Sequence, residues 1–199
     1  TGYDRSIYLR VLLYHDIAPQ EHVYFERQLG WLSRHWTFIS PEKFAAVISG
    51  KEKIQNKSLL LTFDDGFSSN LEVAKKILYP MGIQALFFVV SDLVAIEDRE
   101  EARQFIVRHV QPGLSMEKLP PYLNSMKWSD LELLLEQGHT IGAHTRSHAR
   151  LSEISSSDGL EDEIVSSADS LGNHLGVNIE HFAYTFGDFA SFSSQALSV

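Results

Sequence analysis

The 199-residue chain contains no cysteine, so it forms neither a disulfide nor a thiolate metal site. It has no cluster of Lys and Arg, and its formal net charge is −9. Both features argue against nucleic acids and anionic membrane surfaces as partners, because these bind basic surfaces. No apolar run approaches the roughly 20 residues that a membrane-spanning helix needs. With 44% hydrophobic and 22% charged residues, the composition is typical of a domain with a substantial core.

Short apolar runs alternate with amphipathic stretches along the whole chain. The predicted strands cover residues 9–14, 37–39, 59–63, 84–90, 140–143 and 181–184, and the predicted helices cover residues 25–34, 41–49, 70–79, 129–137 and 160–175. This alternation predicts an α/β fold with parallel strands and right-handed crossovers. We expect one domain over residues 1–199, with an insertion at about residues 96–127, where prolines and charges interrupt the alternation.

Two polar motifs directly follow predicted strands. Asp64 and Asp65 end the strand at residues 59–63, and the stretch "GAHTRSHARL" places His144 and His148 after the strand at residues 140–143. Ligands of parallel α/β sheets bind at the carboxyl ends of the strands, so we expect these side chains to meet there. Two histidines spaced i and i+4, together with one carboxylate, form a three-ligand site for a divalent ion. The other carboxylate then remains free to act as a general base.

Each motif alone has a simpler interpretation. Asp-Asp-Gly after a strand is more often a turn, and His-x-x-x-His is commonly a feature of a surface helix. The occurrence of both motifs at strand ends of one α/β chain favours a metal site. His15, which follows the first predicted strand, is a candidate to line the same mouth, although a structural role is more common for such a histidine.

The two motifs and their surroundings resemble the polysaccharide deacetylase family (carbohydrate esterase family 4, the chitooligosaccharide-deacetylase homology domain). T-F-D-D-G at residues 62–66 and H-T-R-S-H at residues 144–148 are similar to its first two motifs, and "VLLYHDI" and "GIQALFFVV" are similar to flanking text. The resemblance implies a distorted parallel (β/α) barrel that removes N-acetyl groups from an amino-sugar polysaccharide. It also implies one divalent metal ion, for which zinc is the first candidate. Asp65, His144 and His148 are the implied ligands, and Asp64 is the implied general base.

The stretch "FAYTFGD" resembles the third motif of the family. By this resemblance, the backbone N–H of Phe186 serves the oxyanion, and Tyr184 is expected to contact the substrate together with His15. Ala183 stands where relatives place an arginine that orients the base, so Arg146 is a substitute candidate for that role and is expected to contact the substrate.

The last motifs of the family, which supply the histidine that acts as general acid, have no match before Val199. We therefore expect that the barrel lacks its C-terminal strands in this chain, or that a partner chain covers the open edge. Two other functions stay open: hydrolysis of an O-acetyl ester or another non-peptide amide, and sugar binding without catalysis. The resemblance implies an acetylated amino-sugar polymer or oligomer as the partner, and a place in the cell envelope, periplasmic or extracellular.

Overall fold

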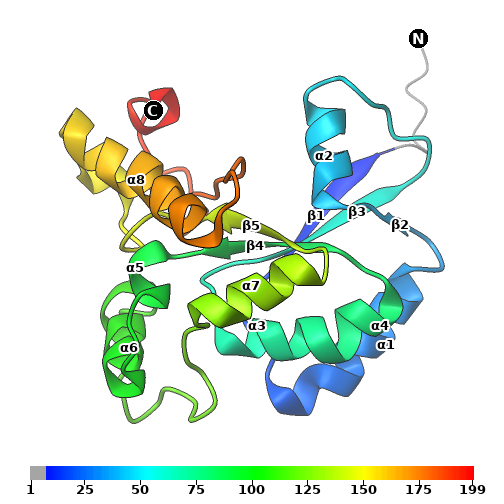
Figure 1. Ribbon diagram of the computed structural model, residues 1–199, viewed down its shortest axis with the longest axis horizontal. Coiled ribbons are helices and arrows are strands. Elements are labelled where there is room, and N and C mark those ends of the chain that lie inside the picture. The colour runs from blue at the N-terminus through cyan, green and yellow to red at the C-terminus, as the bar shows by residue number, and fades with distance from the viewer. Residues whose placement is uncertain (1–7) are drawn as a thin grey trace.

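The computed structural model describes residues 8–199, and five parallel strands form its sheet (Figure 1). The strands are β1 (Leu9–Tyr14), β2 (Thr37–Phe38), β3 (Ser58–Phe63), β4 (Ala85–Val89) and β5 (Thr140–Ala143). The α-helices are α1 (His22–Leu32), α2 (Pro41–Ile48), α3 (Ser68–Val73), α4 (Tyr79–Met81), α5 (Ser91–Val94), α6 (Arg99–Phe105), α7 (Trp128–Glu136) and α8 (Ser157–Leu175). Two π-helical segments, η2 (Ala74–Leu78) and η3 (Ile106–Val110), and three 3₁₀ turns, η1 (Pro19–Glu21), η4 (Leu151–Glu153) and η5 (Ala196–Ser198), complete the described chain.

The strands β1, β3, β4 and β5 follow one another across the sheet, and β2 pairs with the start of β3. All these pairs are parallel, so the predicted α/β class is confirmed. Strands β3 and β4 are buried along their whole length, as their continuous apolar sequence predicts. β1 differs, because Val11 and Leu13 are 51% and 46% exposed. Among the described residues, β3 is the strand that pairs with β1, so one edge of β1 is open.

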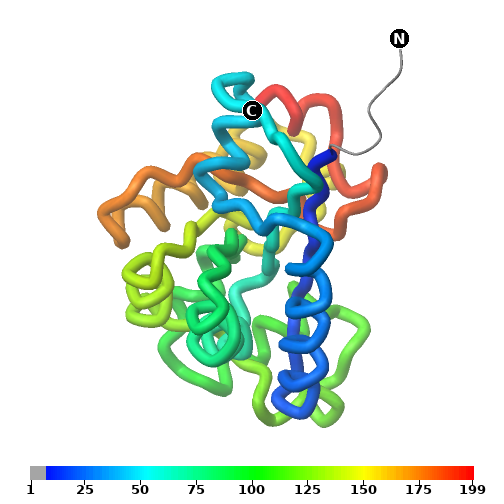
Figure 2. Tube along the Cα trace, turned by 90° about the vertical axis from the view of Figure 1, so that its right-hand side faces the viewer, coloured from blue at the N-terminus to red at the C-terminus, as the bar shows by residue number. Residues whose placement is uncertain are grey.

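The main core lies between the sheet and the helices α1, α3, α4 and α7, which cover one face of it (Figure 1). Phe63 of β3 stacks on Phe87 of β4, with 5.0 Å between the ring centroids. The chain turns back after β1 so that α1 runs alongside it, and Phe25 meets Tyr14 edge to face at 5.0 Å (Figure 2). This burial of large aromatic rings fixes the relative positions of β1, β3 and β4, whose carboxyl ends carry the polar motifs.

Helix starts follow local capping chemistry, with two corrections to the prediction. The Ser40 hydroxyl accepts the N–H of Lys43 and so caps the start of α2, which was predicted from residue 41. α3 begins at Ser68, two residues before the predicted start at residue 70. The buried side-chain amide of Asn70 donates to the carbonyl of Asp64 at 3.4 Å. α7 begins at Trp128, ahead of the predicted Ser129, because the Asp130 carboxylate accepts the N–H of Lys127 at 2.8 Å.

The predicted strand at residues 181–184 is wrong, since this segment makes a single parallel bridge to β5. The N–H of Ala143 donates to the carbonyl of His181 at 2.8 Å, and the N–H of Ala183 donates to the carbonyl of Ala143 at 3.0 Å. The ladder then stops, because the chain turns away through Phe186, whose φ is 65°. Gly142 permits the close approach, since a Cβ there would lie 2.9 Å from the His181 carbonyl oxygen.

The insertion at residues 96–127 forms a packed unit beside the carboxyl end of β4. Ala102 of α6, Ile106 of η3 and Leu123 of the returning loop are buried in one hydrophobic cluster, which also includes Phe67 ahead of α3. The guanidinium of Arg103 donates to three backbone carbonyls of its returning loop, at Leu119, Pro120 and Leu123. The domain boundaries stay predictions.

Within residues 8–199, no helix combines the length and the apolar character needed to cross a membrane.

Candidate active site

A sharp turn after β3 presents the two aspartates. Asp65 and Gly66 both adopt left-handed backbone conformations, with φ of 73° and 79°. At Gly66 a Cβ would lie 3.1 Å from Cγ1 of Val89, so the turn also depends on the absence of a side chain there. Both carboxylates are buried. The carboxyl ends of β3 and β5 lie at the same edge of the parallel sheet, so the aspartates and the histidines are on the same side of the molecule.

Asp65, His144 and His148 form a group with the spacing of metal ligands. Oδ1 of Asp65 lies 3.5 Å from Nε2 of His144 and 3.4 Å from Nε2 of His148. The three candidate ligand atoms all lie within 4.8 Å of one another. Two atoms bound tetrahedrally at about 2.1 Å from one ion are separated by roughly 3.4 Å. The spacing therefore fits a single divalent ion.

Backbone carbonyls orient both imidazole rings. Nδ1 of His144 lies 2.9 Å from the carbonyl oxygen of Ala183, and Nδ1 of His148 lies 3.0 Å from that of His109. A carbonyl only accepts, so each Nδ1 carries the hydrogen and each Nε2 presents a lone pair to the site. His109 belongs to η3, so the insertion supplies one of these two carbonyls.

The two adjacent carboxylates have opposite electrostatic environments. Burial raises the pKa of Asp65, but the nearby imidazoles of His144 and His148 outweigh this effect and hold that pKa below its ordinary value. Burial also raises the pKa of Asp64, and there it prevails over the opposing charge of His144, with Asp65 adding to the rise. Among the described residues, Oδ1 of each aspartate has no hydrogen-bond partner. A cation would satisfy the buried Oδ1 of Asp65, and a water would satisfy that of Asp64.

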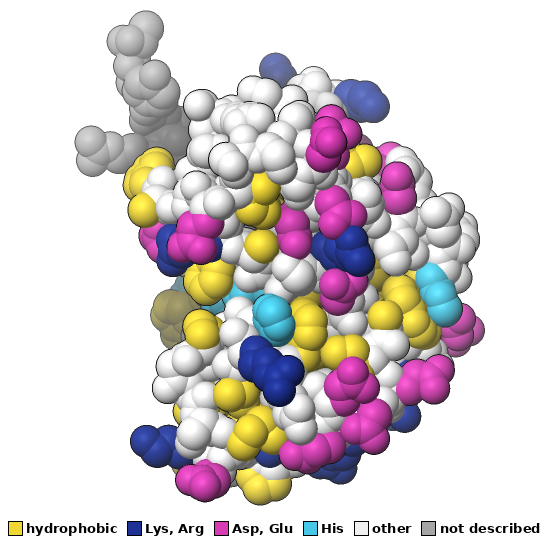
Figure 3. All heavy atoms as spheres, turned by 90° about the vertical axis from the view of Figure 1, so that its left-hand side faces the viewer, with side chains coloured by type: hydrophobic (Ala, Val, Ile, Leu, Met, Phe, Trp, Pro, Cys, Tyr) yellow, Lys and Arg dark blue, Asp and Glu magenta, His cyan; other side chains and the backbone are white. Residues whose placement is uncertain are grey.

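These side chains lie in a cavity of about 430 Å³. The other lining residues are Leu13, His15, Val110, Gln111, Ala183, Tyr184, Phe186 and Gly187. The Phe186 ring meets the His148 ring edge to face at 4.8 Å. Figure 3 views the side of the molecule toward which the strands' carboxyl ends point, and histidine side chains are visible in and beside a notch there. The candidates His15, Tyr184 and Phe186 are thus brought to the cavity.

Arg146 is not among the residues that line the cavity. Its guanidinium contacts Asp92 of α5 at 3.1 Å and Asp162 of α8 at 2.6 Å, on the outer side of the loop. Sequence reasoning also missed Val110 and Gln111, which reach the cavity from the insertion. An apolar residue and a neutral amide carry no sequence signal for a site, so only the folding of the insertion over the sheet reveals them.

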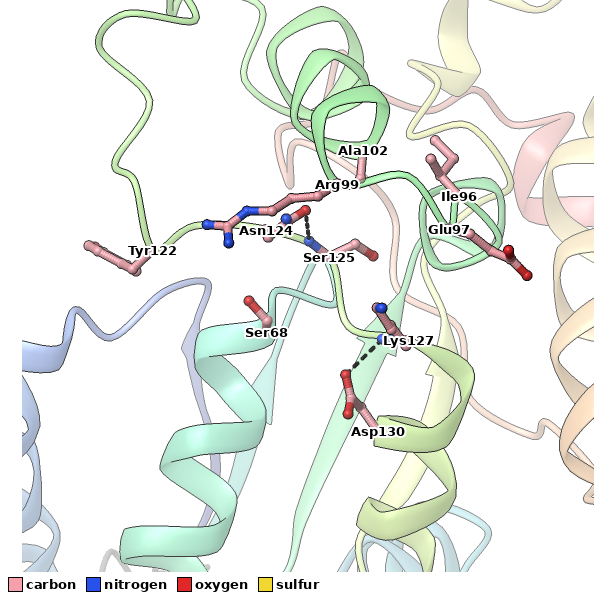
Figure 4. Close-up of a pocket in the computed structure, with 10 residues that line it drawn as sticks. All are labelled: Ser68, Ile96, Glu97, Arg99, Ala102, Tyr122, Asn124, Ser125, Lys127 and Asp130. Carbon is pink, nitrogen blue, oxygen red and sulfur yellow. Dashed lines mark hydrogen bonds between the residues drawn. The ribbon is translucent and has the colours of Figure 1, made fainter.

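A second pocket, of about 320 Å³, lies between the insertion and the starts of α3 and α7 (Figure 4). Its charged lining residues are two basic ones, Arg99 and Lys127, and two acidic ones, Glu97 and Asp130. Asp65, His144 and His148 lie outside this second pocket, so the pocket has no part in the proposed chemistry.

The chain matches known proteins in sequence and in structure. A model of the family described as "Polysaccharide deacetylase" matches residues 51–198. The "Putative polysaccharide deacetylase YxkH" of Bacillus subtilis is 26% identical over 119 residues, which cover 55% of this chain. That match covers 41% of YxkH, so the aligned part is less than half the length of this curated relative.

Three solved structures share the fold. The Streptococcus pyogenes deacetylase PplD, in complex with acetate, has a TM-score of 0.72 at 22% identity, over 97% of this chain and 79% of PplD. IcaB from Ammonifex degensii has a TM-score of 0.73 at 21% identity, over 96% and 78% of the two chains. A de-N-acetylase from Aggregatibacter actinomycetemcomitans has a TM-score of 0.67 at 17% identity, over 96% and 82%.

The family model spans most of the chain and includes both aspartates, both histidines and the segment that bridges to β5. The structural matches agree in fold over almost the whole chain. The chain therefore belongs to the polysaccharide deacetylase family.

Proposed function

We propose that this protein is a hydrolase that removes N-acetyl groups from an amino-sugar polysaccharide with the help of one divalent metal ion. The observation that carries the proposal is the convergence of Asp65, His144 and His148 in the same cavity as a second buried carboxylate, Asp64. A purely structural histidine cluster has no need of a second carboxylate beside it, because this carboxylate adds unfavourable buried charge.

The donor set supports zinc as the ion. One carboxylate oxygen and two imidazole nitrogens are ligands of catalytic zinc sites, which keep a further position open. When bound, such an ion polarises the acetyl carbonyl and lowers the pKa of a water molecule. The residues that would hold it are Asp65, His144 and His148.

Asp64 is the proposed general base. Its Oδ2 lies 4.0 Å from Nε2 of His144, so its carboxylate stands next to the ligand group. Its Oδ1 is buried and has no hydrogen-bond partner among the described residues, so this oxygen is free to accept a proton from a water. In the proposed reaction, Asp64 takes a proton from the water that attacks the acetyl carbonyl.

Two further groups complete the proposed reaction. The backbone N–H of Phe186 is the candidate donor to the oxyanion of the tetrahedral intermediate, since Phe186 lines the cavity. The leaving amine needs a proton, and His15 is the candidate donor. His15 lines the same cavity and lies close enough to Asp64 for its charge to lower the pKa of that carboxyl.

Two relatives support the acetyl amide as the substrate group. PplD was solved with acetate, which is the product of a deacetylation, and the Aggregatibacter protein is described as a de-N-acetylase. We propose that this chain likewise acts on an N-acetyl group and releases acetate. Tyr184 is the proposed contact for the sugar, and the cell envelope is the proposed location. The polymer that carries the acetyl group is the substrate partner.

Acetate release tests the proposal. The chain is incubated with an N-acetylglucosamine oligomer and with acetylxylan, each with and without a chelator, and Asp64→Asn serves as the matched inactive variant. We expect acetate from the amino-sugar oligomer, its loss with chelator, and its return when Zn²⁺ is added back. Release from acetylxylan alone would assign the chain to O-acetyl esters, and oligomer binding without any acetate would assign it to the non-catalytic alternative.

A further inference from the structure

The loop between His144 and His148 has an unusual backbone. Thr145 and His148 both adopt left-handed conformations, with φ of 60° and 62°. A β-branched residue rarely occupies this region, because its branched side chain crowds the backbone. Such conformations persist only where the surrounding structure holds them. The position of the His148 ring therefore depends on contacts that stabilise the loop.

Glu163 of α8 makes three such contacts. Its Oε2 accepts the backbone N–H of Arg146 at 3.0 Å and that of Ser147 at 2.9 Å. Its Oε1 accepts the Ser147 hydroxyl at 2.6 Å. One carboxylate thus satisfies two consecutive N–H groups in the middle of the loop, and hydrogen bonds to a charged acceptor are stronger than neutral ones.

The other side of the loop is held by α5. The N–H of Ser91 donates to the carbonyl of Thr145 at 3.4 Å, and the N–H of Asp92 donates to the carbonyl of Arg146 at 3.0 Å. The loop is therefore clamped between backbone donors of α5 and the carboxylate of Glu163. The ion pairs of Arg146 with Asp92 and Asp162 are solvent-exposed, so they contribute much less to this clamp.

We propose that Glu163 is a positioning residue of the metal site, which holds the loop in the conformation that aims Nε2 of His148 at Asp65 and His144. This inference rests on the proposed function and deepens it. Glu163 is not itself a ligand, because its two carboxylate oxygens are directed to the loop and it lies outside the ligand group. It acts through His148, which directly follows Ser147 in the loop.

Three variants test the role of Glu163. Glu163→Ala removes the acceptor, whereas Glu163→Gln keeps an oxygen for the two N–H groups and an amide that can donate to the Ser147 hydroxyl. Asp162→Ala is the matched control, because Asp162 is the neighbouring carboxylate on the same helix and contacts only the exposed Arg146 side chain of this loop. The measurements are the Kd for Zn²⁺, by competition with a chromogenic chelator, and the visible absorption spectrum of the Co²⁺-loaded chain.

We expect Glu163→Ala to bind Zn²⁺ about 10–100-fold more weakly and to alter the Co²⁺ spectrum, as losses of outer contacts at metal sites do. Glu163→Gln and Asp162→Ala are expected to stay within about threefold of the unchanged chain. Should circular dichroism show that Glu163→Ala does not fold, Glu163→Asp takes its place, since its shorter side chain withdraws the carboxylate.

An unaltered Zn²⁺ affinity in the folded Glu163→Ala or Glu163→Asp variant would overturn the proposal, as would an equal loss in Asp162→Ala. The readout involves no substrate. A chain that shows the expected affinity differences but releases no acetate therefore contradicts the proposed function and supports the role of Glu163. A chain that binds no Zn²⁺ contradicts both.

Discussion

Asp64 and Asp65 are consecutive residues, yet their surroundings move the pKa values of their carboxyl groups in opposite directions. The left-handed backbone at Asp65 turns its carboxylate toward the two histidines, whereas the Asp64 carboxylate lies beside them, with Oδ2 at 4.0 Å from Nε2 of His144. One carboxylate is thus suited to remain ionised as a ligand, and the other is suited to exchange a proton. This divergence is the physical basis for assigning them different roles.

Replacement of Asp64 by Asn is expected to separate catalysis from metal binding. Acetate release should fall by about 10²–10⁴-fold, because an amide cannot accept the proton that a general base takes. Zinc content after dialysis should stay close to that of the unchanged chain. His148→Ala, which removes a ligand, should lose both acetate release and bound zinc. Equal zinc loss in the two variants would contradict the division of roles.

Gly142→Ala is expected to destabilise the fold. A Cβ there would lie 2.7 Å from the Phe88 ring and 2.9 Å from the carbonyl oxygen of His181. Overpacking of this kind costs about 1–3 kcal/mol, so thermal unfolding should move down by several degrees. Gly30→Ala in α1 is the control, since no atom lies within 4 Å of its added Cβ. That change should be neutral or stabilising by up to about 1 kcal/mol. Equal melting temperatures for the two variants would contradict the close approach.

Stability is expected to decline in mild acid because of His139. Burial lowers the pKa of its imidazole to about 4, and its Nδ1 accepts the N–H of Ala85 at 3.1 Å. The unfolded chain binds this proton below a pH of about 6.5, whereas the folded chain binds it only near pH 4. The free energy of unfolding should therefore be unaffected by this group above pH 6.5 and fall by up to about 3 kcal/mol between pH 6.5 and pH 4.

Urea unfolding at several pH values measures this effect. His139→Gln keeps an acceptor for Ala85 without the titration, so it should flatten the pH dependence in this range. His35→Gln, the same change at an exposed site, is the matched control. A slope that survives in His139→Gln would assign the acid sensitivity to other groups.

Arg103→Gln is expected to loosen the insertion. Its guanidinium donates to the carbonyls of Leu119, Pro120 and Leu123. Loss of these charged hydrogen bonds leaves the carbonyls without a donor, and a buried acceptor without a donor costs about 1–3 kcal/mol of folding free energy. Hydrogen exchange measured by mass spectrometry should accelerate in residues 115–125. Arg108→Gln is the control, because Arg108 is exposed and contacts Gln104 at 3.4 Å. Similar exchange in both variants would show that packing alone holds the segment.

Much of the fold and of the site follows from local sequence. The strands β1, β3, β4 and β5 are predicted by their apolar runs, because strands buried in a parallel sheet have little polar sequence. Asp64, Asp65, His144 and His148 are recognisable because their two motifs directly follow such runs, and the carboxyl ends of parallel strands share one edge. The capping serine Ser40 is likewise local chemistry.

Tertiary structure decided the rest, because those features depend on residues far apart in the chain. The segment at residues 181–184 has strand-like sequence, but the turn at Phe186 limits it to one bridge. The exposure of Val11 and Leu13 depends on which strands lie beside β1, and nothing in an apolar run records its neighbours. The backbone carbonyl of His109 that orients His148 has no side-chain signature at all. The sequence by itself determined which residues are able to bind a metal and carry a proton, whereas only the packing of α8 and the insertion against the strand ends decided how they are held.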